Sequence, residues 1–136
     1  MVLLNSPFVE NSYTRKNYPI CVEVRYNCAG SKTNFNLTSL LDIGAAVNLI
    51  DESIVSRFNL GPFVTSTSER VIGIESEPMK AWGEIKFDID ISGFVFPNCK
   101  FLILSGLPVS VLIGRSVIQS RLDELHFDFK KKHVRL

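Results

Sequence analysis

The residue whose type and surroundings best fit catalytic chemistry is Asp42. Two leucines precede it, Ile43, Gly44 and Ala45 follow it, and an apolar stretch resumes over residues 47–50. This pattern places a carboxyl group in a tight loop between two strands, where it can act as a general acid or base. The alternative from the residues alone is a turn aspartate that precedes a glycine in a β-barrel without catalytic activity.

The other acidic side chains fit structural or surface roles. Asp51 can cap a short helix, and Asp88 and Asp90 occupy alternate positions of one predicted strand, so both face the same side. The remaining candidates lie near the C-terminus and fit a solvated surface: Asp123, Glu124 and Asp128. Asp42 is therefore the leading candidate for a catalytic carboxyl group.

The cysteines and histidines do not follow a metal-ligand pattern. The three cysteines contain no CxxC pair, and the two histidines lack HExxH spacing. We expect reduced, structural thiols and no metal site. The residues concerned are Cys21, Cys28, Cys99, His126 and His133.

The elements that must position Asp42 are short strands. Residues 18–26 alternate apolar and polar side chains with a period of two, as a half-buried strand does. Similar patterns, separated by turn residues, predict further strands over 34–41, 47–50, 70–74, 79–91, 95–104 and 109–113, and a last hairpin over 125–136. Short helices are predicted over 52–58, after Asp51, and over 116–122. The chain is therefore predicted to be all-β, a closed barrel or a sandwich, with two short helices.

The composition fits one globular domain. Its 136 residues are 46% hydrophobic, enough for a core without disulfides or metal. The net charge of +1 gives no footprint for nucleic acid or a membrane surface, and the run at 130–132 fits a solvated turn. The first residues lack the basic region of a signal peptide. We therefore expect an intracellular, cytoplasmic protein that binds neither nucleic acid nor membrane, although release from a longer polyprotein also fits.

Two segments in order resemble retropepsin-like aspartic proteases, the retroviral and retrotransposon type. Residues 40–50 resemble the family's active-site segment, in which apolar residues precede Asp-Thr-Gly-Ala and an apolar strand follows. Residues 111–116, about 70 positions later, resemble its apolar strand, Gly-Arg turn and helix. Between them, residues 71–74 and 79–85 are similar to the flap hairpin that closes over bound peptide.

The resemblance implies a closed barrel of the retroviral aspartic protease type with two short helices, assembled as a homodimer. We expect an N-terminal extension over residues 1–17 and a retropepsin-like domain over 18–136. Catalysis in this family uses two carboxylates that face one water, and this chain offers one, so Asp42 of an identical subunit would supply the second at a two-fold axis. The implied partner is a polypeptide substrate or peptide ligand, and no cofactor is implied.

The implied site has three parts. They are the catalytic Asp42 with the active-site loop Ile43, Gly44 and Ala45, the flap residues Gly73 and Ile74, and the supporting turn Gly114 and Arg115. Apolar pockets for peptide side chains would be lined by Ile74, Met79, Val109 and Val111.

Two residues depart from the family pattern. Ile43 stands where the family has Thr or Ser, whose hydroxyl bonds across the dimer axis. Ala46 stands where members commonly carry Asp or Ser to hold the arginine of the Gly-Arg turn, so Arg115 needs a backbone carbonyl or another acid.

The first hypothesis is an aspartic endopeptidase with paired Asp42 carboxylates. The departures favour the second, a catalytically impaired protease-like domain that serves as a homodimerisation or peptide-binding module of a larger protein.

Overall fold

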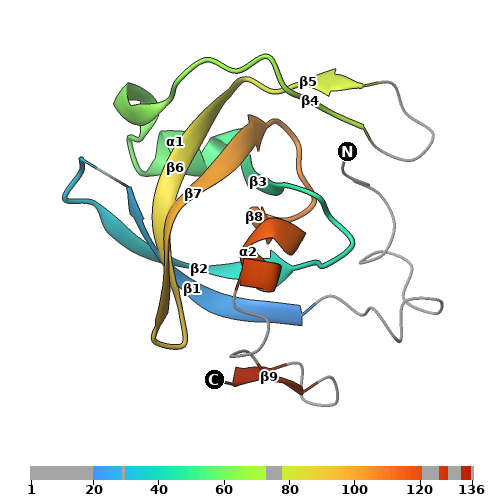
Figure 1. Ribbon diagram of the computed structural model, residues 1–136. Helices are drawn as coiled ribbons and strands as arrows, with labels where there is room; N and C mark the ends of the chain where they lie inside the picture. Colours follow the sequence, from blue (N-terminus) through green and yellow to red (C-terminus); the bar gives the residue numbers. More distant parts are fainter. Residues whose placement is uncertain (1–19, 29, 73–77, 121–125, 129–132, 136) are drawn as a thin grey trace.

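The computed structural model (Figure 1) describes residues 20–28, 30–72, 78–120, 126–128 and 133–135. Six strands close into a barrel in the order β1-β2-β8-β3-β7-β6, and two separate pairs, β4–β5 and β9–β10, lie outside it. The strands are β1 Ile20–Cys28, β2 Asn34–Leu41, β3 Asn48–Asp51, β4 Arg70–Val71, β5 Met79–Lys80, β6 Gly83–Ile91, β7 Phe94–Leu104, β8 Val111–Ile113, β9 His126–Asp128 and β10 His133–Arg135. The helices are α1 Glu52–Arg57, α2 Arg115–Ser120 and a 3-10 turn, η1, Gly61–Phe63. The predicted closed barrel with two short helices is confirmed.

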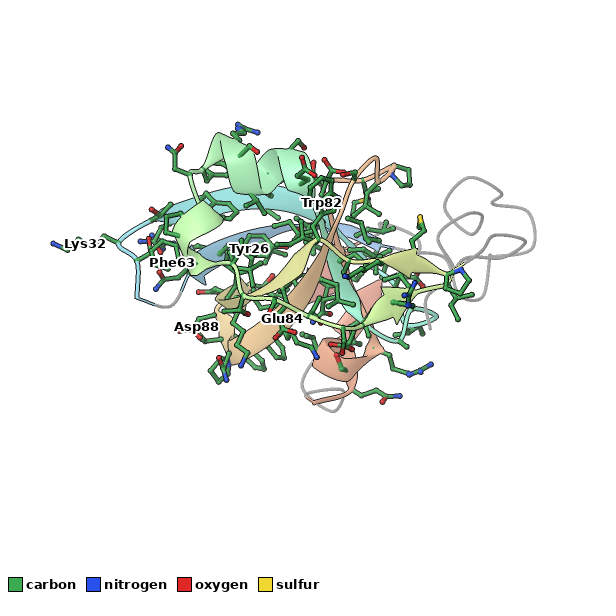
Figure 2. The ribbon with its side chains drawn as sticks, turned by 90° about the horizontal axis from the view of Figure 1, so that it is seen from above. Tyr26, Lys32, Phe63, Trp82, Glu84 and Asp88 are labelled. Carbon is green, nitrogen blue, oxygen red and sulfur yellow. The ribbon has the colours of Figure 1, made fainter. Side chains whose placement is uncertain are left out.

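The interior of the barrel is an aromatic core. The alternation predicted for the first strand holds, because Ile20, Val24 and Tyr26 of β1 are all buried. The Tyr26 ring stacks on Phe35 at 5.3 Å between ring centroids and meets the edge of Phe87 at 5.4 Å. Burial raises the pKa of Tyr26, so its phenol stays neutral and shares a hydrogen bond with the Ser39 hydroxyl. Figure 2 shows this ring inside the barrel.

A second apolar cluster lies on the other face of the barrel wall. Its buried members are Leu40, Ala45, Leu49, Val71, Ala81, Leu102, Leu104 and Leu112. Successive strand residues point to opposite faces, so Leu112 joins this cluster while its neighbours Val111 and Ile113 join the main core. This wall is buried on both faces, which explains the uninterrupted apolar runs of β8 and of the end of β7.

The register of β1 and the helix boundaries refine the predictions. Strand β1 runs to Cys28, which still pairs with Phe87 of β6, so it extends two residues beyond the predicted end at residue 26. Helix α1 begins after Asp51 as predicted, since the Asp51 carboxylate accepts the Ser53 N–H at 3.0 Å. Helix α2 begins at Arg115, one residue earlier than predicted.

The hairpin β4–β5 projects at the top of the barrel in Figure 1. Its register pairs Arg70 with Lys80 and Val71 with Met79. The strand predicted over 79–91 is broken at 81–82, where the chain passes from β5 into the barrel strand β6. The predicted last hairpin is present as β9 and β10, which pair antiparallel. None of the helices described here is long and apolar enough to cross a membrane.

Candidate active site

The loop that carries Asp42 leaves the barrel at the end of β2. Leu41 pairs with Ile113 of the parallel strand β8, and the Asp42 N–H donates to the Ile113 carbonyl at 2.9 Å. The Asp42 carbonyl then accepts the Ala45 N–H at 3.1 Å, which closes a tight turn. The barrel wall thus holds the N–H of Asp42 and the loop itself holds its carbonyl, and the predicted position between two strands is confirmed.

The Asp42 carboxyl group is nearly buried. The residue is 5% exposed, and its Oδ1 accepts the Gly44 N–H at 2.9 Å. Burial raises the pKa of this carboxyl above its ordinary value, against a smaller opposing effect of the Gly44 hydrogen bond. Among the described residues no cation forms an ion pair with it. A buried carboxyl group that holds its proton more tightly than usual is suited to acid–base chemistry.

The three residues after Asp42 differ in environment. Gly44 lies so near the carboxyl group that a methyl group in its place would be 3.1 Å from Asp42 Oδ1. Ala45 is 1% exposed and packs in the second apolar cluster. Ile43, by contrast, exposes 42% of its surface directly beside the buried carboxyl group. The loop therefore presents a large apolar side chain to solvent next to its acid.

The Gly-Arg turn supports this loop through its backbone. Gly114 is packed so closely that a methyl group there would lie 2.5 Å from the Val47 carbonyl oxygen. The Arg115 N–H donates to the Ala45 carbonyl at 2.7 Å. The Arg115 side chain is exposed and forms no ion pair among the described residues, so of the two partners considered for it, a backbone carbonyl or another acid, the acid is not found there.

Asn48 is a supporting residue that the sequence analysis missed. It is 3% exposed, its Oδ1 accepts the Gly114 N–H at 2.8 Å, and its Nδ2 donates to the Lys100 carbonyl at 2.9 Å. The signal in the sequence was a single amide inside the apolar run 47–50. An amide on a buried strand must have hydrogen-bond partners. Here the partners are backbone groups beside the Asp42 loop and in β7.

The hairpin β4–β5 lies over the second apolar cluster. Val71 from β4 and Ala81 after β5 are buried in that cluster together with Ala45 of the Asp42 loop. Its root is tied by an exposed ion pair between Glu69 and Lys100. The expected flap residues, Gly73 and Ile74, lie outside the described residues.

Of the side chains expected to line peptide pockets, Met79 is 38% exposed and Val109 is half-buried beside the second cluster. Val111 is wrong as a pocket residue, because its side chain is fully buried in the main core. The strand parity places Leu112, its neighbour, on the face of the second cluster instead. Among the described residues, no group of three or more potential ligands could hold a metal ion.

Comparisons with known proteins agree with this architecture. No family model matches the chain, and no curated protein matches it. Among solved structures, the chain is similar to the retroviral protease-like domain of Ddi1 from Leishmania major, with 14% identity and a TM-score of 0.56 over 85% of this chain and 89% of that one. It is also similar to a retropepsin-like aspartic protease from Rickettsia conorii, with 18% identity and a TM-score of 0.61 over 88% of this chain and 81% of that one. The chain therefore has the closed-barrel fold of retropepsin-like aspartic proteases.

Proposed function

We propose that this chain is one subunit of a homodimeric aspartic endopeptidase in which Asp42 supplies half of the catalytic pair. The observation that carries the proposal is the state of Asp42, a nearly buried carboxyl group on a loop fixed by the barrel wall, with no ion-pair partner among the described residues. The solved structures with this fold include a protein described as an aspartic protease. A second copy would bring an identical carboxyl group to the same place.

The chemistry follows from two adjacent carboxyl groups that share one proton. The ionised group takes a proton from a bound water, whose oxygen attacks the carbonyl carbon of the peptide bond. The protonated group donates its proton to the carbonyl oxygen and takes it back when the tetrahedral intermediate collapses, while the other carboxyl group passes the proton from water to the amide nitrogen and the C–N bond breaks. The raised pKa of Asp42 extends the pH range in which one of the two groups keeps its proton.

The substrate would be an extended polypeptide between the Asp42 loop and the hairpin β4–β5, which acts as the flap. The exposed Met79 on that hairpin and the half-buried Val109 provide apolar surface for its side chains. Exposed Ile43 fits the same arrangement, because a large apolar side chain beside the acid would be covered by the second subunit. Assembly and catalysis would therefore use one face of the barrel.

The test is cleavage of an unfolded protein substrate at several pH values. We expect cleavage to be fastest below neutral pH and to be lost in Asp42→Asn, because an amide cannot take the proton from water. The matched control is Asp90→Asn, since an amide oxygen at the β6–β7 turn can still accept the Gly93 N–H that Asp90 accepts now. Cleavage that survives Asp42→Asn, or that is lost equally in both variants, would contradict the proposal.

A second candidate function is favoured by Ile43 itself. Because this side chain has no hydroxyl, it cannot make the hydrogen bond across the axis that the family resemblance implies, and the domain could instead hold two copies of a larger protein together without cleaving peptides. Ile43→Thr separates the two functions. For a peptidase weakened by this departure, the threonine variant should dimerise more tightly, by about 1–3 kcal/mol for a symmetric pair of bonds, and cleave faster. Weaker dimerisation of the variant in sedimentation, with cleavage by neither protein, would favour the dimerisation module.

A further inference from the structure

The loop between β2 and β3 meets the start of α2 through three consecutive residues. The Ile113 carbonyl accepts the Asp42 N–H at 2.9 Å, and the Arg115 N–H donates to the Ala45 carbonyl at 2.7 Å. The contact between these two is different, because Gly114 donates its N–H to the side chain of Asn48. The central hydrogen bond of this junction therefore depends on the Asn48 side chain. The two outer hydrogen bonds join backbone groups, so they do not depend on which side chains are present.

The Asn48 amide also joins this junction to the barrel wall. Its Nδ2 donates to the carbonyl of Lys100 in β7, so one planar group connects β7, the start of β3 and the Gly-Arg turn. Asn48 and Gly114 are both buried. Loss of the amide would leave the Gly114 N–H without its present partner, at a cost of the kind that displaces a loop.

The position requires an acceptor and a donor at once. A neutral amide supplies both, Oδ1 to the Gly114 N–H and Nδ2 to the Lys100 carbonyl. An ionised carboxylate of the same shape supplies the acceptor but sets a negative oxygen against the Lys100 carbonyl. A protonated carboxyl group restores the donor, so the fit of aspartate at this position depends on pH.

We propose that Asn48 is a positioning residue for Asp42, and that its amide fixes the loop so that the Asp42 carboxyl group meets its counterpart in the second subunit. Asn48 does not touch the substrate in this arrangement. It acts through Gly114, which packs against the carbonyl groups of Ala45 and Val47 at the end of the Asp42 turn. The kinetic part of the test rests on the proposed peptidase function and the dimer constant rests on the proposed homodimer, whereas the Asp42 titration rests on neither.

The kinetic test compares Asn48→Asp with wild type across pH. Burial favours the neutral form of the new carboxyl group, so the ratio of kcat between variant and wild type should approach one as the pH falls into the acidic range. At about pH 7 it is ionised, and kcat should fall at least about tenfold with a smaller change in KM, because the Asp42 carboxyl group is displaced while the apolar surface at Met79 and Val109 is kept. Asn36→Asp makes the same chemical change at an exposed site on β2 and should give a ratio that does not vary with pH. The same pH-independent ratio for Asn48→Asp would overturn the proposal.

The titration test uses Asn48→Ala, which adds no charge. Asn48 also lines an open cavity of about 560 Å³, so water can enter near the truncated side chain and support folding. We expect the carboxyl signal of Asp42 in NMR to titrate at a different pH in this variant, and the dimer to dissociate at least about tenfold more readily in sedimentation. An unchanged Asp42 titration and dimer constant in a folded Asn48→Ala would overturn the positioning role. If Asn48→Ala does not fold, the dimer dissociation constant of Asn48→Asp is measured in the acidic range and at about pH 7 instead. A constant equal to that of wild type at both would overturn the positioning role. Absence of cleavage by wild type would overturn the peptidase proposal alone.

Discussion

The Asp42 loop and the hairpin β4–β5 face the same apolar cluster but are held in different ways. Backbone bonds to Ile113 and Arg115 and the buried Asn48 side chain fix the loop. Two residue pairs form the described part of the hairpin, and its residues from 78 to 80 are exposed. The root of the hairpin is joined to the barrel by the Trp82 N–H, which donates to Ile103 at 2.9 Å, and by the exposed ion pair of Glu69 with Lys100.

In the proposed peptidase, this difference would separate the group that must stay in place from the element that must open. Opening the hairpin exposes few buried side chains, since Val71 and Ala81 are its described contributions to the second cluster. Moving Asp42 would instead break buried hydrogen bonds, each costing roughly 1–3 kcal/mol if left unpaired. The free energy of local unfolding differs between parts of a protein, and elements that open over a site are usually among the parts with the lowest values.

The largest effect is expected where the Asp42 loop is tightest. Gly114→Ala should lower the free energy of unfolding by about 3 kcal/mol, because the added methyl group would lie 2.5 Å from the Val47 carbonyl oxygen and 2.8 Å from that of Ala45. Urea unfolding of the purified wild type and variant measures this change in the free energy of unfolding. Gly61→Ala is the control, since a methyl group at 61 meets nothing within 4 Å, and its change should stay within about 0.5 kcal/mol. Equal effects at both positions would show that the junction is not tight.

A smaller effect, with a defined pH dependence, is expected from Asp42 itself. Its pKa is raised in the folded protein by burial, so the folded state binds the proton more tightly than the unfolded chain does. Stability from this group is therefore present at low pH and is lost as the pH rises from its ordinary value of 3.8 through the raised value. Asp42→Asn removes this loss. At neutral pH the variant should be more stable than wild type by on the order of 1 kcal/mol in urea unfolding, and the gain should disappear at low pH.

Asp51 provides a comparison of opposite sign. Burial alone would raise its pKa, but the hydrogen bonds that it accepts from Ser53 and the Leu107 N–H outweigh burial, so its pKa lies below the ordinary value. Its contribution is present above the ordinary pKa and is lost as the pH falls through the lowered value. Asp51→Asn should therefore be destabilising at neutral pH, by about 1 kcal/mol, and less so in acid. If both variants changed stability in the same direction, the different environments assigned to these two carboxyl groups would be wrong.

The sequence predicted the elements well where local pattern decides them. The period of two predicted β1, the run 34–41 gave the bounds of β2, and Asp51 marked the start of α1. These features depend on neighbours in the chain, which a sequence displays directly. The resemblance to retropepsins was carried by residues 40–50 and 111–116, and these two segments do meet, through β2 and β8.

The features that the sequence did not predict depend on contacts between distant segments. Val111 and Leu112 are equally apolar, and only the register of β8 against its neighbours decides which of them faces the main core. The role of Asn48 needs Gly114, 66 residues away, and the Lys100 carbonyl, 52 residues away. The Arg115 contact came from its backbone N–H, whereas sequence reasoning looked for a partner of its side chain.

The smallest predicted effect tests the weakly held side of the comparison. Both partners of the Glu69–Lys100 ion pair are about 40% exposed, at 40% and 41%, so Glu69→Gln should cost the whole protein at most about 1 kcal/mol. Its effect should instead be local, because the Glu69 carbonyl accepts the Ala81 N–H at 3.4 Å at the root of the hairpin. We expect faster hydrogen exchange at Ala81 in the variant and unchanged exchange in the barrel strands.

The charge dependence of this effect distinguishes an ion pair from a packing contact. The hydrogen bond and charge of Glu69 raise the pKa of Lys100, so the pair stabilises below the ordinary lysine value of 10.5 and its contribution is lost as the pH rises through the raised value. The difference in Ala81 exchange between Glu69→Gln and wild type should therefore shrink in high salt, where exposed pairs are screened. Glu23→Gln is the matched control, because Glu23 is an exposed carboxylate on β1 that accepts a hydrogen bond from Thr38 and forms no ion pair among the described residues. Exchange at Ala81 that is the same in all three proteins would mean that the hairpin is held by its apolar contacts, Val71 above all, and that the ion pair contributes nothing to its closure.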